Sequence, residues 1–161
     1  MAKIYAILNP IKGAWHLRIE RIAPGGDLSA AYLVRTAVFI EEQGFSAELE
    51  IDNTDPLAHH VVFFDGDEPA ATARTFPDES DPKRYIIGRV AVCKSFRGTG
   101  LGLELMQAIE AYAKELGAVS FSLGAQLQAA PFYRKCGYAV YGEHYYDEHC
   151  EHVHMQKEVI L

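Results

Sequence analysis

The sequence predicts an α/β fold in which helices cover both faces of a mixed, twisted β-sheet. Its β-rich and amphipathic segments follow the order β-α-β-β-β-α-β-α-β-β, which is neither a regular alternation nor an all-β pattern. The strand-helix-strand unit at residues 85–123 needs a crossover that leaves its two strands parallel. With 161 residues, 49% of them hydrophobic, the chain matches a single domain over 1–161 with one core.

Four strands and one helix are expected in the first half of the chain. Residues 15–22 alternate apolar and polar side chains, and a helix capped by Asp27 or Ser29 then runs to about Gly44. The next strands cover 58–65, 70–76 and 85–92; DGDEP signals a hairpin between the first two, and a polar, proline-containing loop precedes the third. Residues 1–14 are expected to be a tail or an extra edge strand around Ile4 to Leu8.

Two helices and three strands are expected in the second half. Thr99 or Gly100 opens a helix that runs to Leu116, and Gly117 stops it. A strand at 119–123, a short helix at 131–135 and strands at 138–142 and 149–158 complete the chain.

Composition excludes several classes of partner. Fifteen basic and 22 acidic side chains give a net charge of −7, so binding to nucleic acid or to an anionic membrane is not expected. No apolar run spans a bilayer and MAKIYAILNPIKG lacks the features of a signal peptide, so the sequence indicates a cytoplasmic protein. Three widely spaced cysteines, Cys93, Cys136 and Cys150, are expected to be reduced packing residues.

The segment RGTGLG at residues 97–102 is a candidate loop for binding a phosphate. Small residues let backbone N–H groups converge on an anion, and the following helix N-terminus adds roughly half a positive charge. Arg97 can pair with phosphate oxygens, while Gly98, Gly100 and Gly102 have no Cβ to block close approach. A glycine turn that only packs the helix on the sheet is the alternative.

Two common nucleotide-binding motifs do not fit this segment. A P-loop needs Lys-Ser/Thr after its last glycine, where Leu103 and Glu104 stand. A dinucleotide fingerprint needs a later third glycine and an acidic residue at the end of the next strand, which ends in Leu123 and Gly124.

RVAVCKSFRGTGLG, followed by a helix, a strand and AAPFYRKCGY, resembles the signature of the GNAT superfamily of acyl-CoA N-acyltransferases. Within it, VRTAVFIEEQG, ELEIDNTD, AHHVVFF, the Ala125-Gln126 pair and HVHM resemble the ElaA-like branch. The resemblance implies a central mixed sheet of about six to seven strands with about four flanking helices. It also implies acetyl-CoA as co-substrate and an N-acetyltransferase that moves the acetyl group directly to a primary amine of a small molecule or peptide.

The resemblance assigns the cofactor contacts to two segments. Backbone amides of the loop would hold the CoA pyrophosphate, and the preceding strand would run beside the pantetheine arm. A backbone N–H near Val92 would polarise the thioester carbonyl. The residues so implicated are Val90, Ala91, Val92, Arg97, Gly98, Thr99, Gly100, Leu101 and Gly102.

Tyr133 matches the family tyrosine that lies near the CoA sulfur and can protonate the departing thiolate. A phenol with a reference pKa of about 10 is a plausible donor to a thiolate whose conjugate acid has one of about 8.5. A packing role in the core is the alternative. Gln126 could hydrogen-bond the cofactor, or it could be a solvated loop residue.

The acceptor side of the site is less well defined. An attacking amine must lose a proton, and Glu42 in FIEEQG is the candidate general base, although this acidic cluster could equally be solvated surface. Asp52 and Asp55 could attract a cationic substrate, or IDNTDP could form an Asx-turn. Arg89 is a further candidate for a substrate contact, because a charge in a buried run needs a partner. Arg74 raises the same question, and an ion pair with Glu42 or Asp52 would satisfy either arginine without a role in the site.

Histidines supply the remaining candidates. Either His59 or His60 faces inward and could contact substrate; His59 is taken as the candidate. Cys150, His152 and His154 share a strand face, but the reaction needs no metal and none is expected. His152 occupies the histidine of the branch's HxxM pattern, which favours an active-site contact or proton relay.

Two other functions stay open. The pattern of Arg35, Val38, Phe39, Gly44, Glu50, Asp52 and Asp55 resembles acyl-homoserine-lactone synthases, which use acyl carriers and adenosylmethionine. A non-catalytic CoA-binding domain would keep the loop without needing Tyr133. Because dimers are common among such folds, a homodimer is a candidate assembly.

Overall fold

The computed structural model describes residues 17–159. These residues group into two compact units. One contains the described residues up to Arg74 together with Arg89–Ile109, and the other contains Thr75–Gly88 and the residues from Glu110 onward. The expected strand or tail at 1–14 and the first residues of the expected strand at 15–22 lie outside the described part of the chain.

Seven strands in the described part of the chain form one mixed sheet, which confirms the predicted fold class. In order along the sheet they are β1 (Leu17–Ile22), β2 (His59–Asp65), β3 (Glu68–Asp78), β4 (Asp81–Val92), β5 (Ser120–Gln126), β7 (Cys150–Glu158) and β6 (Ala139–Asp147). β4 and β5 are parallel, as the crossover rule requires, whereas β1 with β2, β5 with β7 and β6 with β7 pair antiparallel.

Within residues 17–159, four α-helices, one π-helix and three 3₁₀ turns connect these strands. The α-helices are α1 (Ser29–Arg35), α2 (Ala47–Glu50), α3 (Leu101–Glu115) and α4 (Ala130–Lys135). A π-helix, η1 (Thr36–Glu42), continues α1, and single 3₁₀ turns occur at η2 (Asp55–Leu57), η3 (Lys94–Phe96) and η4 (Leu127–Ala129). No helix within residues 17–159 is long and apolar enough to cross a bilayer.

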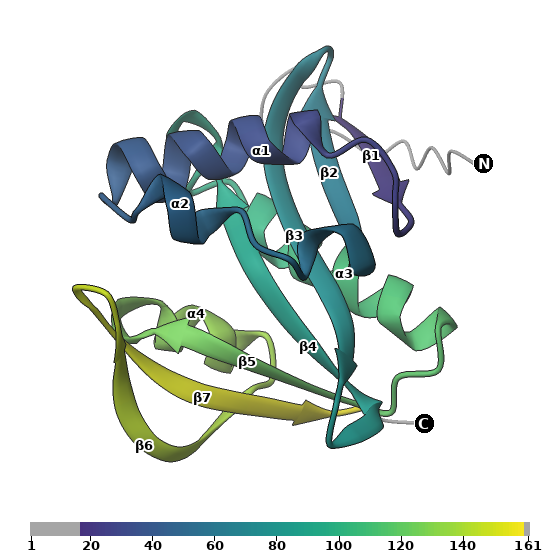
Figure 1. Ribbon diagram of the computed structural model, residues 1–161, viewed down its shortest axis with the longest axis vertical. Helices are drawn as coiled ribbons and strands as arrows, with labels where there is room; N and C mark the ends of the chain where they lie inside the picture. The colour runs from purple at the N-terminus through teal and green to yellow at the C-terminus, as the bar shows by residue number, and fades with distance from the viewer. Residues whose placement is uncertain (1–16, 160–161) are drawn as a thin grey trace. The chain divides into compact units, whose positions relative to one another are not determined.

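In the first unit, α1 and α2 lie over one face of the strands and the first half of α3 over the other (Figure 1). β2 is apolar on both sides, and its Val61, Val62 and Phe63 are fully buried. Ile22 and Ala31 pack with Val62, so β1 and α1 share a core with β2. A second cluster, formed by Val34, Val38 and Ala91, joins α1 and η1 to the end of β4.

In the second unit, β5 and β7 form an antiparallel ladder from Ser120 opposite Glu158 to Gln126 opposite His152. Leu123 and Met155, which lie opposite each other in this ladder, are both buried. β6 lies at the end of the sheet order and its pairing with β7 shifts register between Tyr141 and Tyr145.

The structure extends several predicted elements. β3 and β4 reach Asp78 and Asp81, so the expected proline-containing loop is mostly strand with Pro77 and Pro82 in extended backbone. The helix expected to run to Gly44 is α-helical only to Arg35. Beyond it the N–H of Gln43 donates to the carbonyl of Val38, five residues back, as in a π-helix.

Candidate functional site

The glycine loop leaves backbone donors open at the start of α3. In the described part of the chain, the N–H groups of Gly98, Thr99 and Gly100 donate no hydrogen bond. Gly98 and Gly100 have φ of +75° and +88°, and a Cβ built on either would meet nothing within 4 Å. Glycine is therefore needed here for the left-handed backbone, and the space beside it is open to an anion.

Arg89 interrupts the regular conformation of β4 just before Val90. Its φ is +51°, a rare value for a residue with a side chain, and the ladder with β5 covers only residues 84–86 and 120–122. Beyond the interruption Ala91 packs against Val34 and Val38. Breaks of this kind re-aim a strand and are common beside functional sites.

Glu42 and Arg97 form a bidentate ion pair. Nη1 and Nη2 of Arg97 donate to Oε2 and Oε1 of Glu42 at 2.5 and 2.6 Å, and Nε donates to the Val92 carbonyl at 2.9 Å. The hydrogen bond and charge of Arg97 lower the pKa of Glu42. A carboxylate with a lowered pKa is a poor proton acceptor, so this geometry argues against the predicted role of Glu42 as general base.

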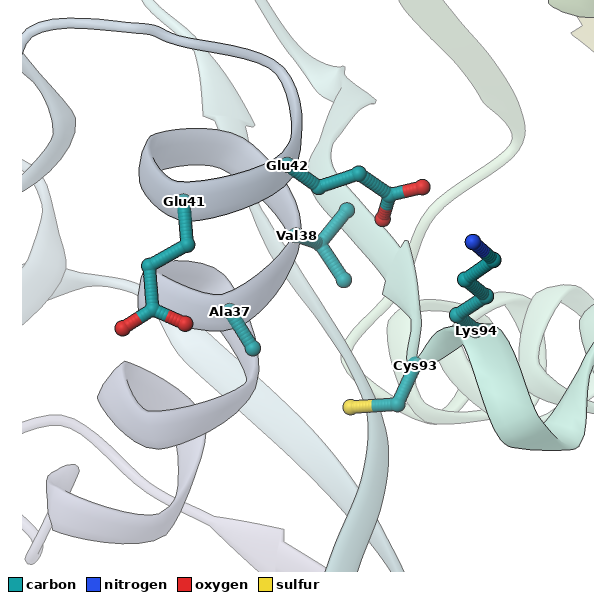
Figure 2. Close-up of a pocket in the computed structure, with 6 residues that line it drawn as sticks. All are labelled: Ala37, Val38, Glu41, Glu42, Cys93 and Lys94. Atoms are coloured by element: carbon teal, nitrogen blue, oxygen red, sulfur yellow. The ribbon is translucent and has the colours of Figure 1, made fainter.

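A pocket of about 270 Å³ opens beside this ion pair, between η1 and the end of β4. Ala37, Val38, Glu41, Glu42, Cys93 and Lys94 line it (Figure 2). The side chains of Glu42 and Lys94 point to the same region at the end of β4, whereas Glu41 points away from them (Figure 2). Burial raises the pKa of the Cys93 thiol, so it stays protonated, as expected of a packing cysteine.

A second group of charges is buried beneath α1 and α2. The group consists of three guanidinium groups and three carboxylates, those of Arg35, Arg74, Arg89, Glu50, Asp52 and Asp55. Asp55 is at its centre, 2.7 Å from Nη1 of Arg35 and 2.8 Å from Nη1 of Arg74. Because the six charges sum to zero, no net negative charge is left to attract a cationic substrate.

Asp52 and Arg89 form the more exposed edge of this group. Burial would raise the pKa of Asp52, but the hydrogen bonds and charge of Arg74, with the charge of Arg89, outweigh it and lower the pKa to about 2. Arg74 therefore has Asp52 as a partner, as predicted, and not Glu42. The Asp52 side chain also accepts from the N–H of Thr54 at 3.1 Å, which confirms the Asx-turn alternative.

The two neighbouring histidines at the start of β2 differ in environment. His60 is buried, and its Nε2 donates to the Asp55 carbonyl at 3.0 Å. Burial lowers the pKa of both His59 and His60, so both are neutral at pH 7. His60 is thus the inward histidine and supports the buried charges, while His59, the predicted substrate contact, is half-buried.

Tyr133 is buried in the second unit, on α4. Its ring packs edge to face with Phe132 and Tyr138, at centroid distances of 5.1 and 6.1 Å. Burial raises its pKa well above that of a free phenol, so the hydroxyl keeps its proton. Within residues 17–159 that hydroxyl makes no side-chain hydrogen bond, which leaves it available to a bound atom.

Four rings of β6 and β7 stack on one another. Tyr141, His154, Tyr145 and His152 follow one another at centroid distances of 5.5, 4.5 and 5.5 Å, with interplanar angles below 30°. Gly124 lies beneath them, and a Cβ there would overlap the Tyr145 hydroxyl. Because the Tyr145 ring separates the two imidazoles, His152 and His154 do not face each other as metal ligands would. No group of three metal-binding side chains occurs among the described residues.

His152 and Gln126 are cross-strand partners at the end of the β5–β7 ladder. Nδ1 of His152 lies 2.9 Å from the Cys150 carbonyl oxygen. Because a carbonyl can only accept, Nδ1 carries the proton and donates it. In the neutral ring Nε2 then has a lone pair. Gln126 is the last residue of β5 rather than a loop residue, and its Oε1 accepts from Nε2 of Gln128 at 2.6 Å.

The cluster of Glu110, Tyr138 and Lys157 was not predicted from the sequence. Glu110 accepts from the Tyr138 hydroxyl at 2.8 Å and from Nζ of Lys157 at 3.0 Å, and Nζ also donates to the Cys136 carbonyl at 2.7 Å. The only available signal was a charged residue at a core position of the helix pattern, and it did not reveal the partners.

Comparison with known proteins places these features in a family. A model described as "Acetyltransferase (GNAT) domain" matches residues 28–159. YjcF of Bacillus subtilis (strain 168), described as an uncharacterized N-acetyltransferase, is 39% identical over 132 residues, which cover 81% of this chain and 92% of YjcF. ElaA of Escherichia coli (strain K12) is 32% identical over 136 residues, which cover 83% of this chain and 88% of ElaA.

Solved structures agree with this comparison. The E. coli ElaA crystal structure has a TM-score of 0.78 at 27% identity and covers 88% of this chain and 99% of its own. Two more distant structures share only the fold. A B. subtilis acetyltransferase in complex with CoA has a TM-score of 0.68 at 20% identity and covers 89% of this chain and 99% of its own. The acyl-homoserine lactone synthase BjaI with SAM and isopentyl-CoA has a TM-score of 0.75 at 18% identity and covers 88% of this chain and 83% of its own. The extent of the family match and of the likeness to YjcF and ElaA shows that the chain belongs to the GNAT family of acetyltransferases.

Proposed function

We propose that the chain transfers the acetyl group of acetyl-CoA directly to a primary amine of a small molecule or peptide. The observation that carries the proposal is the open set of backbone N–H groups at Gly98, Thr99 and Gly100, in a member of an acetyltransferase family. Such a set at a helix start suits the pyrophosphate of CoA. Val90, Ala91 and Val92, beyond the interruption at Arg89, would run beside the pantetheine arm.

Tyr133 is the proposed general acid. Its hydroxyl is buried, protonated and without a side-chain partner in the described residues, so it can donate to a thiolate as the thiolate leaves. Transfer needs no enzyme nucleophile. The three cysteines support this, because burial raises the pKa of each thiol and keeps it protonated.

His152 is the proposed proton acceptor for the amine. Its Nδ1 hydrogen bond to Cys150 sets the tautomer that leaves Nε2 free to accept. Glu42, the general base predicted from the sequence, is the weaker candidate because it is ion-paired with Arg97.

The acyl-homoserine-lactone synthase alternative has less support. Arg35, Glu50, Asp52 and Asp55, which carry that resemblance, are paired with one another or with Arg74 and Arg89 beneath α1 and α2. These ion pairs stabilise the fold, and that role alone explains why the four residues occur together. A synthase would consume adenosylmethionine, whereas the proposed enzyme would not.

Two measurements test the proposal. Calorimetry should show CoA binding to the wild type and weaker binding to Gly100→Ala, while Gly25→Ala binds normally. Gly25 is a matched control because its φ of +82° resembles the +88° of Gly100 and a Cβ at either site meets nothing. Acetyl-CoA turnover is then measured against amines, polyamines and peptides. Absence of CoA binding would refute the proposal, and binding without acylation of any amine would favour the non-catalytic CoA-binding domain.

A further inference from the structure

We propose that Glu42 is a positioning residue that occupies the phosphate-binding fork of Arg97 and competes with the pyrophosphate of the ligand for it. The inference rests on the proposed use of acetyl-CoA. It gives Glu42 a positioning role that acts through Arg97.

The geometry of Arg97 is that of an arginine already bound to an anion. All three of its nitrogens are engaged, Nε with the Val92 carbonyl at 2.9 Å and Nη1 and Nη2 with the Glu42 carboxylate at 2.5 and 2.6 Å. The fork that would match two phosphate oxygens therefore holds two carboxylate oxygens instead. Arg97 directly precedes Gly98, so the occupied fork and the open N–H groups belong to the same loop.

The two hydrogen bonds fix the geometry of the Glu42–Arg97 pair, but a ligand can still displace Glu42 from Arg97. The side chains of Arg97 and Glu42 are 40% and 35% exposed, so water and ligands reach them and the net stability of the pair is small. A guanidinium has five N–H donors, and these three hydrogen bonds leave two donors for an incoming anion. A monoanion gains little by replacing Glu42. A pyrophosphate brings more charge and can also use the backbone donors beside Arg97.

The π-helix η1 directs Glu42 to this place, and Lys94 offers it a second partner. Glu42 is the last residue of η1 and points to the same region as Lys94, while Glu41 points away (Figure 2). The charge of Lys94 contributes to the lowered pKa of Glu42. A carboxylate released by Arg97 therefore stays beside a cation, which lowers the cost of the exchange.

The test compares ligands with and without a pyrophosphate by calorimetry on the full chain. Glu42→Gln removes the competing charge, so it should tighten CoA binding about three- to tenfold. The binding of inorganic pyrophosphate should tighten by a similar factor. The binding of pantetheine, which has no phosphate, should not change. The gain should shrink in high salt because the two charges are exposed. Glu42→Asp should bind CoA much as the wild type does. Glu41→Gln, the same charge change on the neighbouring residue, should have no effect.

Arg97→Gln completes a double-mutant cycle. If Glu42 acts through Arg97, Glu42→Gln gives no gain in the Arg97→Gln background. Equal gains from Glu41→Gln and Glu42→Gln would overturn the inference in favour of a general charge effect. Unchanged or weaker CoA binding in a folded Glu42→Gln variant would also overturn it. Both results presuppose CoA binding by the wild type, so they are distinguishable from failure of the proposed function, which is the absence of that binding.

Discussion

Arg35 and Asp55 form a bidentate ion pair in which each side chain is at most 1% exposed, with N–O distances of 2.7 and 3.0 Å. Arg35 ends α1, and Asp55 begins the 3₁₀ turn before β2. Two segments on either side of the short helix α2 are thus joined inside the protein by charge and not by apolar packing alone.

Asp55→Asn should destabilise the protein by about 3–5 kcal/mol, because it leaves Arg35 and Arg74 buried with too little negative charge. Urea unfolding followed by circular dichroism measures the change. Asp67→Asn, on the exposed turn between β2 and β3, is the matched control and should stay within about 0.5 kcal/mol of the wild type. A loss below about 1 kcal/mol for Asp55→Asn would mean that the buried charges rearrange or admit water.

Stability should fall as the pH drops below about 4. The pKa of Asp52 is about 2 in the folded chain against 3.8 for the free group, and that of Asp55 is also lowered. Groups with depressed folded pKa values stabilise fully above the unfolded value, and the contribution is lost as pH falls through the folded one. Unfolding free energies measured from pH 6 to 2.5 should therefore drop more steeply for wild type than for Asp52→Asn, by up to about 1.4 kcal/mol per pH unit. Parallel curves for the two proteins would contradict the pairing of Asp52 with Arg74.

Gly124→Ala should destabilise the protein by about 1–2 kcal/mol, since the new Cβ overlaps the Tyr145 hydroxyl and Tyr145 is stacked between two histidines. Tyr145→Phe removes that hydroxyl. The next atom, Cζ, would be 3.4 Å from the Cβ, an ordinary contact, so the alanine should cost much less in the Tyr145→Phe background. Thermal melts of the two single variants and the double variant give the coupling, and simple additivity would show that the overlap is relieved elsewhere.

Tyr133→Phe should lower kcat by about 100-fold while KM for acetyl-CoA changes little, if the phenol protonates the leaving thiolate. The melting temperature should hardly change, because the hydroxyl makes no side-chain hydrogen bond in the described residues. Tyr138→Phe is a useful comparison, since it removes a hydroxyl that bonds Glu110 and should therefore lower stability more than kcat. Unchanged turnover in Tyr133→Phe would give Tyr133 a packing role only.

Elements that depend on local patterns could be predicted from the sequence. α3 begins within two residues of its expected start and ends one residue before its expected end, since glycines mark both ends of an apolar helical repeat. The π-helix could not be predicted, because its hydrogen bonds differ from those of an α-helix while its apolar positions do not. Strand ends at Pro77 and Pro82 were missed because proline lacks an N–H but accepts an extended backbone.

Side-chain partners were harder to predict than elements. Arg74 and Arg89 were expected to need carboxylates, and Asp52 was identified, but Glu50 and Asp55 came from the fold. Glu42 and Arg97 are 55 residues apart, and nothing in the spacing of either indicates their contact. The sequence shows which residues are charged and lie in buried runs, but which carboxylate pairs with which arginine follows only from the tertiary structure.

The interleaving of the two compact units has a practical consequence for dissecting the protein. Each unit is built from two separated stretches of chain, with changes from one to the other after Arg74, Gly88 and Ile109. No single cut can therefore separate one whole unit from the other. A cut after Arg74 would part Glu42 from Lys94 and Cys93, which line the same pocket. Activity from two such fragments would have to come from complementation, and its appearance on mixing would report their association.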